Sequence, residues 1–193
     1  MGGLTKDLGI MSNTQMTIAF WLNVENTFRG WRNVFLMGNH GATDDSTRAG
    51  FRIPLLQIYP KEEWFNSYYT NCANLHFRFG TINNHNDGLK PGGNGPLEYD
   101  PDLRFPFGQD IHITFTIAGK TIKYYQNGVE KFSRTLNNNE RFVNNNSTTR
   151  LYMSPSNDIQ HTSGVKLKNF QIFNRPLNGG EVMEVYNQIV CKY

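Results

Sequence analysis

The chain has 193 residues, of which 38% are hydrophobic and 18% charged, a composition that fits one globular domain and excludes an intrinsically disordered chain. Its formal net charge of +3 comes from scattered lysines and arginines without a basic stripe, so nucleic acid is not an expected partner. No apolar run approaches the ~18 residues that cross a bilayer, and the N-terminus lacks an apolar core of signal-peptide length, so neither membrane insertion nor a signal peptide is expected.

One domain is expected over residues 1–193, because no internal repeat divides the chain. Residues 1–13 are expected to be extended or to derive from cloning. The two cysteines, Cys72 and Cys191, leave the redox compartment open. They either pair with each other or remain free thiols, since a secreted disulfide framework usually uses more than two.

Alternating apolar and polar residues predict strands along most of the chain. Residues 16–24 keep a period of two over nine positions, which is typical of a half-buried strand. The side chains expected to face the core are those of Met16, Ile18, Phe20, Leu22 and Val24, and those expected to face outward are Thr17, Ala19, Trp21 and Asn23. Residues 33–39, 53–59 and 74–82 add further short strands.

The second half of the chain repeats this pattern. In residues 111–119 the expected inward side chains are Ile111, Ile113, Phe115 and Ile117, and the outward ones are His112, Thr114 and Thr116. Asn127-Gly128 supplies two residues that accept a positive φ, which predicts a hairpin turn within residues 120–133.

Two more strands are expected in residues 150–154 and 164–173. In the second, the inward set changes from Val165 and Leu167 to Phe170 and Ile172. This change of face predicts a β-bulge near Lys168 and Asn169.

A helix is expected only near the C-terminus. Within residues 176–190, apolar side chains recur at helical spacing at Val182, Val185, Tyr186 and Ile189. Asn178 stands three residues before Glu181, as in a capping box. Some nine short strands followed by one short helix predict an all-β fold, a two-sheet antiparallel jelly-roll sandwich.

Three long segments interrupt the strands, at residues 38–50, 83–110 and 135–149. In the second, prolines at positions 91, 96, 101 and 106 exclude a central strand. Long ordered loops in a compact domain are uncommon and are often functional.

This order of elements resembles the concanavalin A-like lectin/glucanase superfamily, in particular its laminin-G-like branch. The resemblance rests on residues 16–24, 30–39, 53–60, 74–88, 111–130 and 164–182, and its most specific parts are the hairpin at residues 125–128 and the ending "NFQIFNRPLNGGEV". It implies two antiparallel sheets, one of them concave, with loops at one rim that often bind calcium and sugar. Members include lectins, adhesion modules and glycosidases, so the resemblance alone does not decide the function.

A carbohydrate-binding rim is the main site hypothesis. Aromatic faces pack on the C–H surfaces of sugars, while amide, acidic and basic side chains bond to hydroxyl groups. We expect the two strands at 53–59 and 74–82 to bring the insert between them and the polar segment after the second strand together at one end of the sandwich. The expected ligand-binding residues are Trp64, Tyr68, Tyr69, His76, Arg78, Asn83, Asn84, His85, Asn86 and Asp87. The alternative for the insert is a local mini-core formed by Trp64 and Phe65.

An enzyme remains an alternative. Retaining glycosidases need two carboxyl groups about 5 Å apart. Residues 98–102 offer Glu98, Asp100 and Asp102, close to the superfamily's acidic strand motif, but Pro101 lies inside the motif and both flanks are typical of a loop. His76 and Arg78 on one strand face also fit, loosely, the residues that lyases of acidic sugars use.

Calcium is the expected cofactor. It takes six to eight oxygen ligands from carboxylates, amides and carbonyls. Asp44 and Asp45 are the expected metal ligands, and Asn86 with Asp87 and the acidic residues of 98–102 are further oxygen donors. Each cluster equally suits turn formation, because Asn and Asp cap turns with their own side chains.

Together these patterns predict a non-catalytic carbohydrate-binding or adhesion module of a viral structural or extracellular protein. The expected partner is a glycan or glycoprotein. Two alternatives remain open: a virion module that binds other structural proteins, and a glycan-cleaving hydrolase or lyase.

Overall fold

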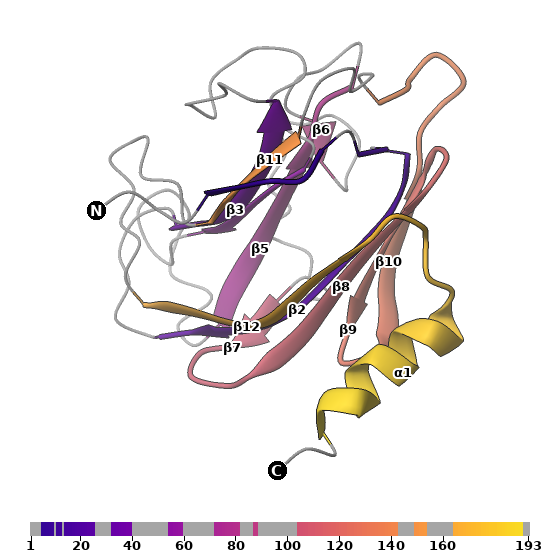
Figure 1. Ribbon diagram of the computed structural model, residues 1–193. Coiled ribbons are helices and arrows are strands. Elements are labelled where there is room, and N and C mark those ends of the chain that lie inside the picture. The colour runs from indigo at the N-terminus through magenta and orange to yellow at the C-terminus, as the bar shows by residue number, and fades with distance from the viewer. Residues whose placement is uncertain are drawn as a thin grey trace.

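Two antiparallel β-sheets and a C-terminal helix make up the structure, which is a computed structural model (Figure 1). It describes residues 5–9, 11–12, 14–25, 32–39, 54–59, 72–81, 87–88, 104–142, 149–153 and 164–190. The predicted fold class, a two-sheet sandwich with one short helix, is confirmed. None of the helical residues in these ranges forms a span long and apolar enough to cross a membrane.

The seven-stranded sheet has the strand order β1-β11-β3-β4-β5-β6, and β7 pairs with β5 beside β6. Its strands are β1 (Thr5–Asp7), β3 (Arg32–Asn39), β4 (Leu55–Tyr59), β5 (Cys72–Phe79), β6 (Asp87–Gly88), β7 (Arg104–Pro106) and β11 (Thr149–Met153). All its pairings are antiparallel.

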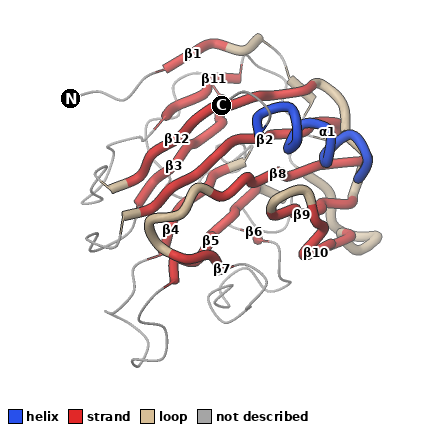
Figure 2. The backbone as a smooth tube through the Cα atoms, turned by 90° about the horizontal axis from the view of Figure 1, so that it is seen from below, coloured by secondary structure: helices blue, strands red, loops and turns tan. Residues whose placement is uncertain are grey.

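The five-stranded sheet has the order β10-β9-β8-β2-β12. Its strands are β2 (Gln15–Val24), β8 (Ile111–Ala118), β9 (Thr121–Gln126), β10 (Val129–Thr135) and β12 (Val165–Phe173). Helix α1 (Gly179–Val190) lies on the side of this sheet that faces away from the seven-stranded sheet (Figures 1 and 2).

The main core lies between the two sheets. Phe77 of β5 stacks on Phe115 of β8 with ring centroids 3.9 Å apart, and Phe20 of β2 meets Phe35 of β3 edge-on at 5.7 Å. The inward residues predicted for β2 and β8 are all buried in this core. The alternation of the sequence therefore identified the inner face of both strands correctly.

The residues of these strands that were predicted to face outward are not exposed to solvent. Thr17, Ala19, His112, Thr114 and Thr116 are all buried, and Trp21 and Asn23 are half-buried. Ala19 packs with Val182 and Val185 of α1 in a second, smaller core. The prediction was wrong because the helix covers this face, so both faces of β2 and β8 exclude water.

The hairpin, the bulge and the helix cap are confirmed. Asn127 and Gly128 have φ values of 51° and 80° at the β9–β10 turn. The β12–β2 register shifts between Lys168 and Gln171, and Asn169 has a φ of 51°. The capping box of α1 is formed as predicted, with Asn178 and Glu181 exchanging backbone-to-side-chain hydrogen bonds of 2.8 and 3.0 Å.

Segment 83–110 contains two short strands that the sequence did not predict. Asp87–Gly88 pairs with the end of β5, and Arg104–Pro106 pairs with its beginning. Both lie at the same edge of β5, where Pro106 fits because an edge strand tolerates a residue without an N–H donor. The exclusion of a central strand from this segment agrees with the sheet order.

Candidate ligand-binding site

A row of polar side chains crosses the outer face of the seven-stranded sheet. Asn33 of β3 is the cross-strand partner of Gln57 of β4, and Gln57 is the partner of His76 of β5. Arg78 follows two residues later on the same face of β5. We call Asn33, Gln57, His76 and Arg78 the polar row. The neighbouring residues on each strand point into the main core, so the polar row faces away from it.

Leucines lie directly beside the polar row. Leu36, Leu55 and Arg78 are successive cross-strand partners on β3, β4 and β5. Both leucines are buried, but neither belongs to the core between the sheets. On this face of the sheet, buried hydrogen-bonding side chains therefore lie beside buried aliphatic ones.

Hydrogen bonds hold the polar row in place. The Nε2 of Gln57 donates to Oδ1 of Asn33 over 2.7 Å, and the Nε of Arg78 donates to Nε2 of His76 over 2.6 Å. Because a guanidinium can only donate, Nε2 of His76 accepts this hydrogen bond. The four side chains are 4–6% exposed, which means that the row is rigid and dry.

The side chains of the polar row carry one fixed positive charge and several hydrogen-bonding groups. Arg78 keeps its positive charge under all ordinary conditions. The amides of Asn33 and Gln57 offer both donors and acceptors. The row itself contains no carboxyl pair of the kind that glycoside hydrolysis requires.

The structure places only part of the predicted site. His76 and Arg78 lie together in the polar row, and the backbone of Asp87 pairs with Phe79 in β6. The other predicted site residues lie outside the described residues: Asp44, Asp45, Trp64, Tyr68, Tyr69, Asn83, Asn84, His85, Asn86, Glu98, Asp100 and Asp102. Their roles stay predictions. Cys72 is a free thiol, so the alternative in which it pairs with Cys191 is not realised.

The insert between β4 and β5 and the polar segment after β5 were expected at one end of the sandwich. They are attached at opposite ends, so this expectation is wrong. Residues 60–71 join the end of β4 to the start of β5, whereas residues 82–86 follow the end of β5. Strand β5 is eight residues long, so at ~3.3 Å per residue its ends lie roughly 23 Å apart. Antiparallel pairing therefore attaches residues 40–53 and 82–86 at one end and residues 60–71 at the other.

No cluster of three or more His, Cys, Asp or Glu residues suited to a metal ion occurs among the described residues. The predicted ligands Asp44 and Asp45 are not among them. Calcium binding therefore stays a prediction.

Asn33 and Gln57 were missed by the sequence analysis. Gln57 is a lone polar residue within a predicted strand, and Asn33 is the first residue of another. That pattern hints at a special role, but only the strand register shows that the two side chains meet each other and His76.

Two antiparallel sheets packed face to face define a β-sandwich. The chain belongs to the concanavalin A-like lectin/glucanases superfamily, whose Laminin_G_3 family matches residues 3–183. A comparison with curated proteins found no matching sequence.

Solved structures with a similar fold come from several kinds of protein. A sialidase from Trypanosoma rangeli matches with a TM-score of 0.55 and 14% identity, over 93% of this chain and 23% of the sialidase. The binding domain of botulinum neurotoxin serotype D matches with a TM-score of 0.56 and 13% identity, over 96% of this chain and 38% of the toxin domain chain. A heptameric SAP-like pentraxin from Limulus polyphemus matches with a TM-score of 0.55 and 12% identity, over 94% of this chain and 74% of the pentraxin.

At these identities the likeness shows the fold alone. The chain spans about a quarter of the sialidase and two fifths of the neurotoxin fragment.

Proposed function

We propose that this chain is a non-catalytic carbohydrate-binding or adhesion module. Its ligand binds at the outer face of the seven-stranded sheet, where the polar row forms a rigid base. The segments that leave the ends of β3, β4 and β5 supply the direct contacts, among them the aromatic residues Trp64, Tyr68 and Tyr69.

The polar row is the observation that carries this proposal. Four polar side chains cost free energy to bury unless they are hydrogen-bonded. Here they form two hydrogen-bonded pairs, Asn33 with Gln57 and His76 with Arg78, on three adjacent strands beside aliphatic side chains. Because the row is almost fully buried, it would hold the segments that contact the sugar and would not touch the sugar itself.

The family membership and the structural neighbours agree with a binding role. The neighbours include a toxin receptor-binding domain and a pentraxin as well as a sialidase. Placement of the module in a virion or an extracellular protein rests on the resemblance of its sequence, as does the use of calcium.

A glycan array probed with the full chain, with and without calcium, tests the proposal. We expect binding to a limited set of glycans. Trp64→Ala and Tyr69→Ala should each weaken binding about tenfold, because a buried aromatic contact contributes on the order of 1–2 kcal/mol. Val129→Ala is the matched control, since Val129 is an exposed apolar side chain on the other sheet.

Two results would contradict the proposal. Absence of glycan binding up to millimolar concentrations, with and without calcium, would favour a structural module that binds proteins. Release of sugar from a polysaccharide panel that disappears in Glu98→Gln would instead identify an enzyme. If Trp64→Ala lowers the melting temperature without changing glycan affinity, Trp64 belongs to a local mini-core.

A further inference from the structure

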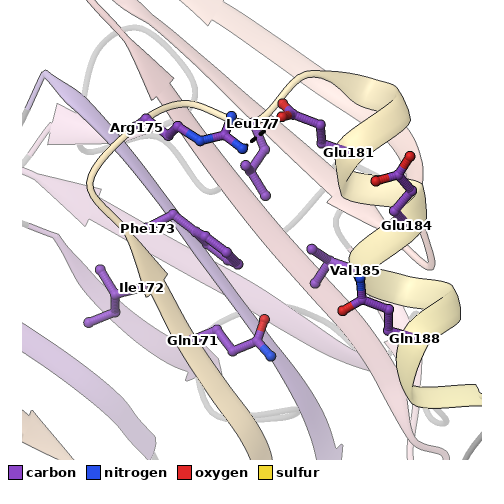
Figure 3. A pocket seen from close by; sticks show the side chains of 9 residues that line it. All are labelled: Gln171, Ile172, Phe173, Arg175, Leu177, Glu181, Glu184, Val185 and Gln188. Carbon is purple, nitrogen blue, oxygen red and sulfur yellow. Dashed lines mark ion pairs between the residues drawn. The ribbon is translucent and has the colours of Figure 1, made fainter.

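A groove lies between strand β12 and helix α1, on the opposite sheet from the polar row. Its volume is about 470 Å³, within the range of roughly 300–1,000 Å³ that is typical of ligand sites. Phe173 and Gln171 line it from β12, and Val185 and Gln188 from α1 (Figure 3). We call this the helix groove.

The helix groove exists because α1 covers only part of its sheet. The helix packs on Ala19 of β2 and Tyr125 of β9, while β12 is the edge strand. The outer face of β12 therefore stays beside the helix and not beneath it, and Gln171 and Phe173 are half-buried. The fold leaves this groove open without any further movement.

The end wall of the helix groove is firmly anchored. The hydroxyl of Thr17 donates to the carbonyl oxygen of Arg175 over 2.9 Å and accepts from the N–H of Leu177 over 2.8 Å. Arg175 also forms an ion pair of 2.7 Å with Glu181 in the first turn of α1. A preformed site costs a ligand less ordering free energy than a flexible one.

The polar groups of the helix groove are amides and one carboxylate. The side chains of Gln171 and Gln188 point toward each other across the groove (Figure 3). Neither makes a side-chain hydrogen bond within the described part of the chain. Each amide offers both a donor and an acceptor, as does the hydroxyl group of an alcohol or sugar.

The charge of the helix groove disfavours anions. Arg175 and Glu181 neutralise each other in their ion pair. Glu184 also lines the groove and has no ion pair among the described residues, so these three groups leave a net charge of −1. A carboxylate or phosphate ligand would be repelled by Glu184 in this setting.

We infer that the helix groove binds a neutral, hydroxyl-rich ligand of about disaccharide size. The amides of Gln171 and Gln188 bond to hydroxyl groups from two sides, and Glu184 accepts from a third. The apolar side chains of Phe173, Leu177 and Val185 contact the C–H face. This is a second site, independent of the one proposed on the seven-stranded sheet.

An NMR titration of the full chain with lactose, maltose and cellobiose tests the inference. With at least one of the three sugars, we expect amide shifts at residues 171–173 and 185–188 and a dissociation constant in the millimolar range. Gln188→Leu should weaken binding about fivefold, the effect of losing one neutral hydrogen bond. Asn187→Leu, at the neighbouring exposed helix position, is the matched control and should bind normally.

Three results would overturn the second site. One is the absence of groove shifts with all three sugars at millimolar concentrations. Another is binding of glucuronate as tight as that of the neutral sugars, which would contradict the charge argument. The third is loss of groove binding in Trp64→Ala with an unchanged melting temperature. Trp64 is proposed to serve the site on the other sheet, so an independent groove should keep its affinity in this variant.

Discussion

At the scale of single residues, His112 stands out because its ring is buried and uncharged. The side chain is 1% exposed, and neither ring nitrogen has a hydrogen-bond partner among the described residues. It lies against Trp21 and Tyr186, with ring centroids 5.3 and 5.7 Å away. Burial lowers the pKa of His112 from 6.5 to about 4.

His112 should therefore make the fold sensitive to acid. Between the unfolded pKa of 6.5 and the folded value of about 4, the unfolded state binds a proton that the folded state does not. Stability should fall by about 3 kcal/mol as the pH drops through this range, and should level off below it. Urea denaturation at a series of pH values from neutral to acid measures this slope.

The matched variant is His112→Gln, which cannot titrate. Its stability should depend less on pH in the same range, even if it is less stable at neutral pH. An identical pH slope in the two proteins would assign the acid sensitivity to other groups.

Gly128 shows a second constraint on a single residue. Its φ of 80° disfavours any residue with a side chain, and a Cβ there would lie 2.8 Å from Sδ of Met183 on α1. Gly128→Ala should cost about 1–3 kcal/mol of unfolding free energy, measured by chemical denaturation. Combining it with Met183→Ala should recover part of the loss, and no recovery would show that the backbone strain alone matters.

At the scale of elements, the hydrogen bonds of the polar row should matter more for binding than for stability. Asn33→Leu with Gln57→Leu removes both partners of their shared bond and replaces them with similar volume. Stability should then fall by less than the sum of the losses in the two single variants, because in each single variant the remaining amide stays buried without this bond. Glycan binding should fall strongly, and unchanged affinity would remove the row from the site.

The cap of α1 allows a separate test of how the helix is held. Asn178→Ala removes the acceptor for the Glu181 N–H and should cost about 1 kcal/mol in a thermal or urea melt. The neighbouring Arg175 and the Asn178 N–H hold the pKa of Glu181 below its usual value. Asn187→Ala, an exposed change in the same helix, should cost much less, and equal losses would argue against the cap.

At the scale of the whole molecule, the fold could be predicted because its signals are local. Alternation over residues 16–24 and 111–119, the Asn127-Gly128 turn and the cap at Asn178 each lie within a few residues of one another. The burial of His112 and Thr114 could not be predicted in this way. It depends on where a helix some 70 residues later packs.

The site was less predictable for the same reason. His76 and Arg78 share a strand, so their common face follows from a period of two. Their neighbours Gln57 and Asn33 join them only through the register of three strands. The opposite attachment of residues 60–71 and 82–86 follows from the antiparallel directions of β4 and β5.

Recognition of a glycan without its cleavage is the central claim for the whole molecule. An NMR titration with a glycan selected on the array follows the protein and the sugar in one sample. We predict amide shifts in β3, β4 and β5 and in the segments joined to them, with the sugar signals chemically unchanged over time. Shifts confined to other parts of the chain, or new signals from a cleaved sugar, would contradict the account.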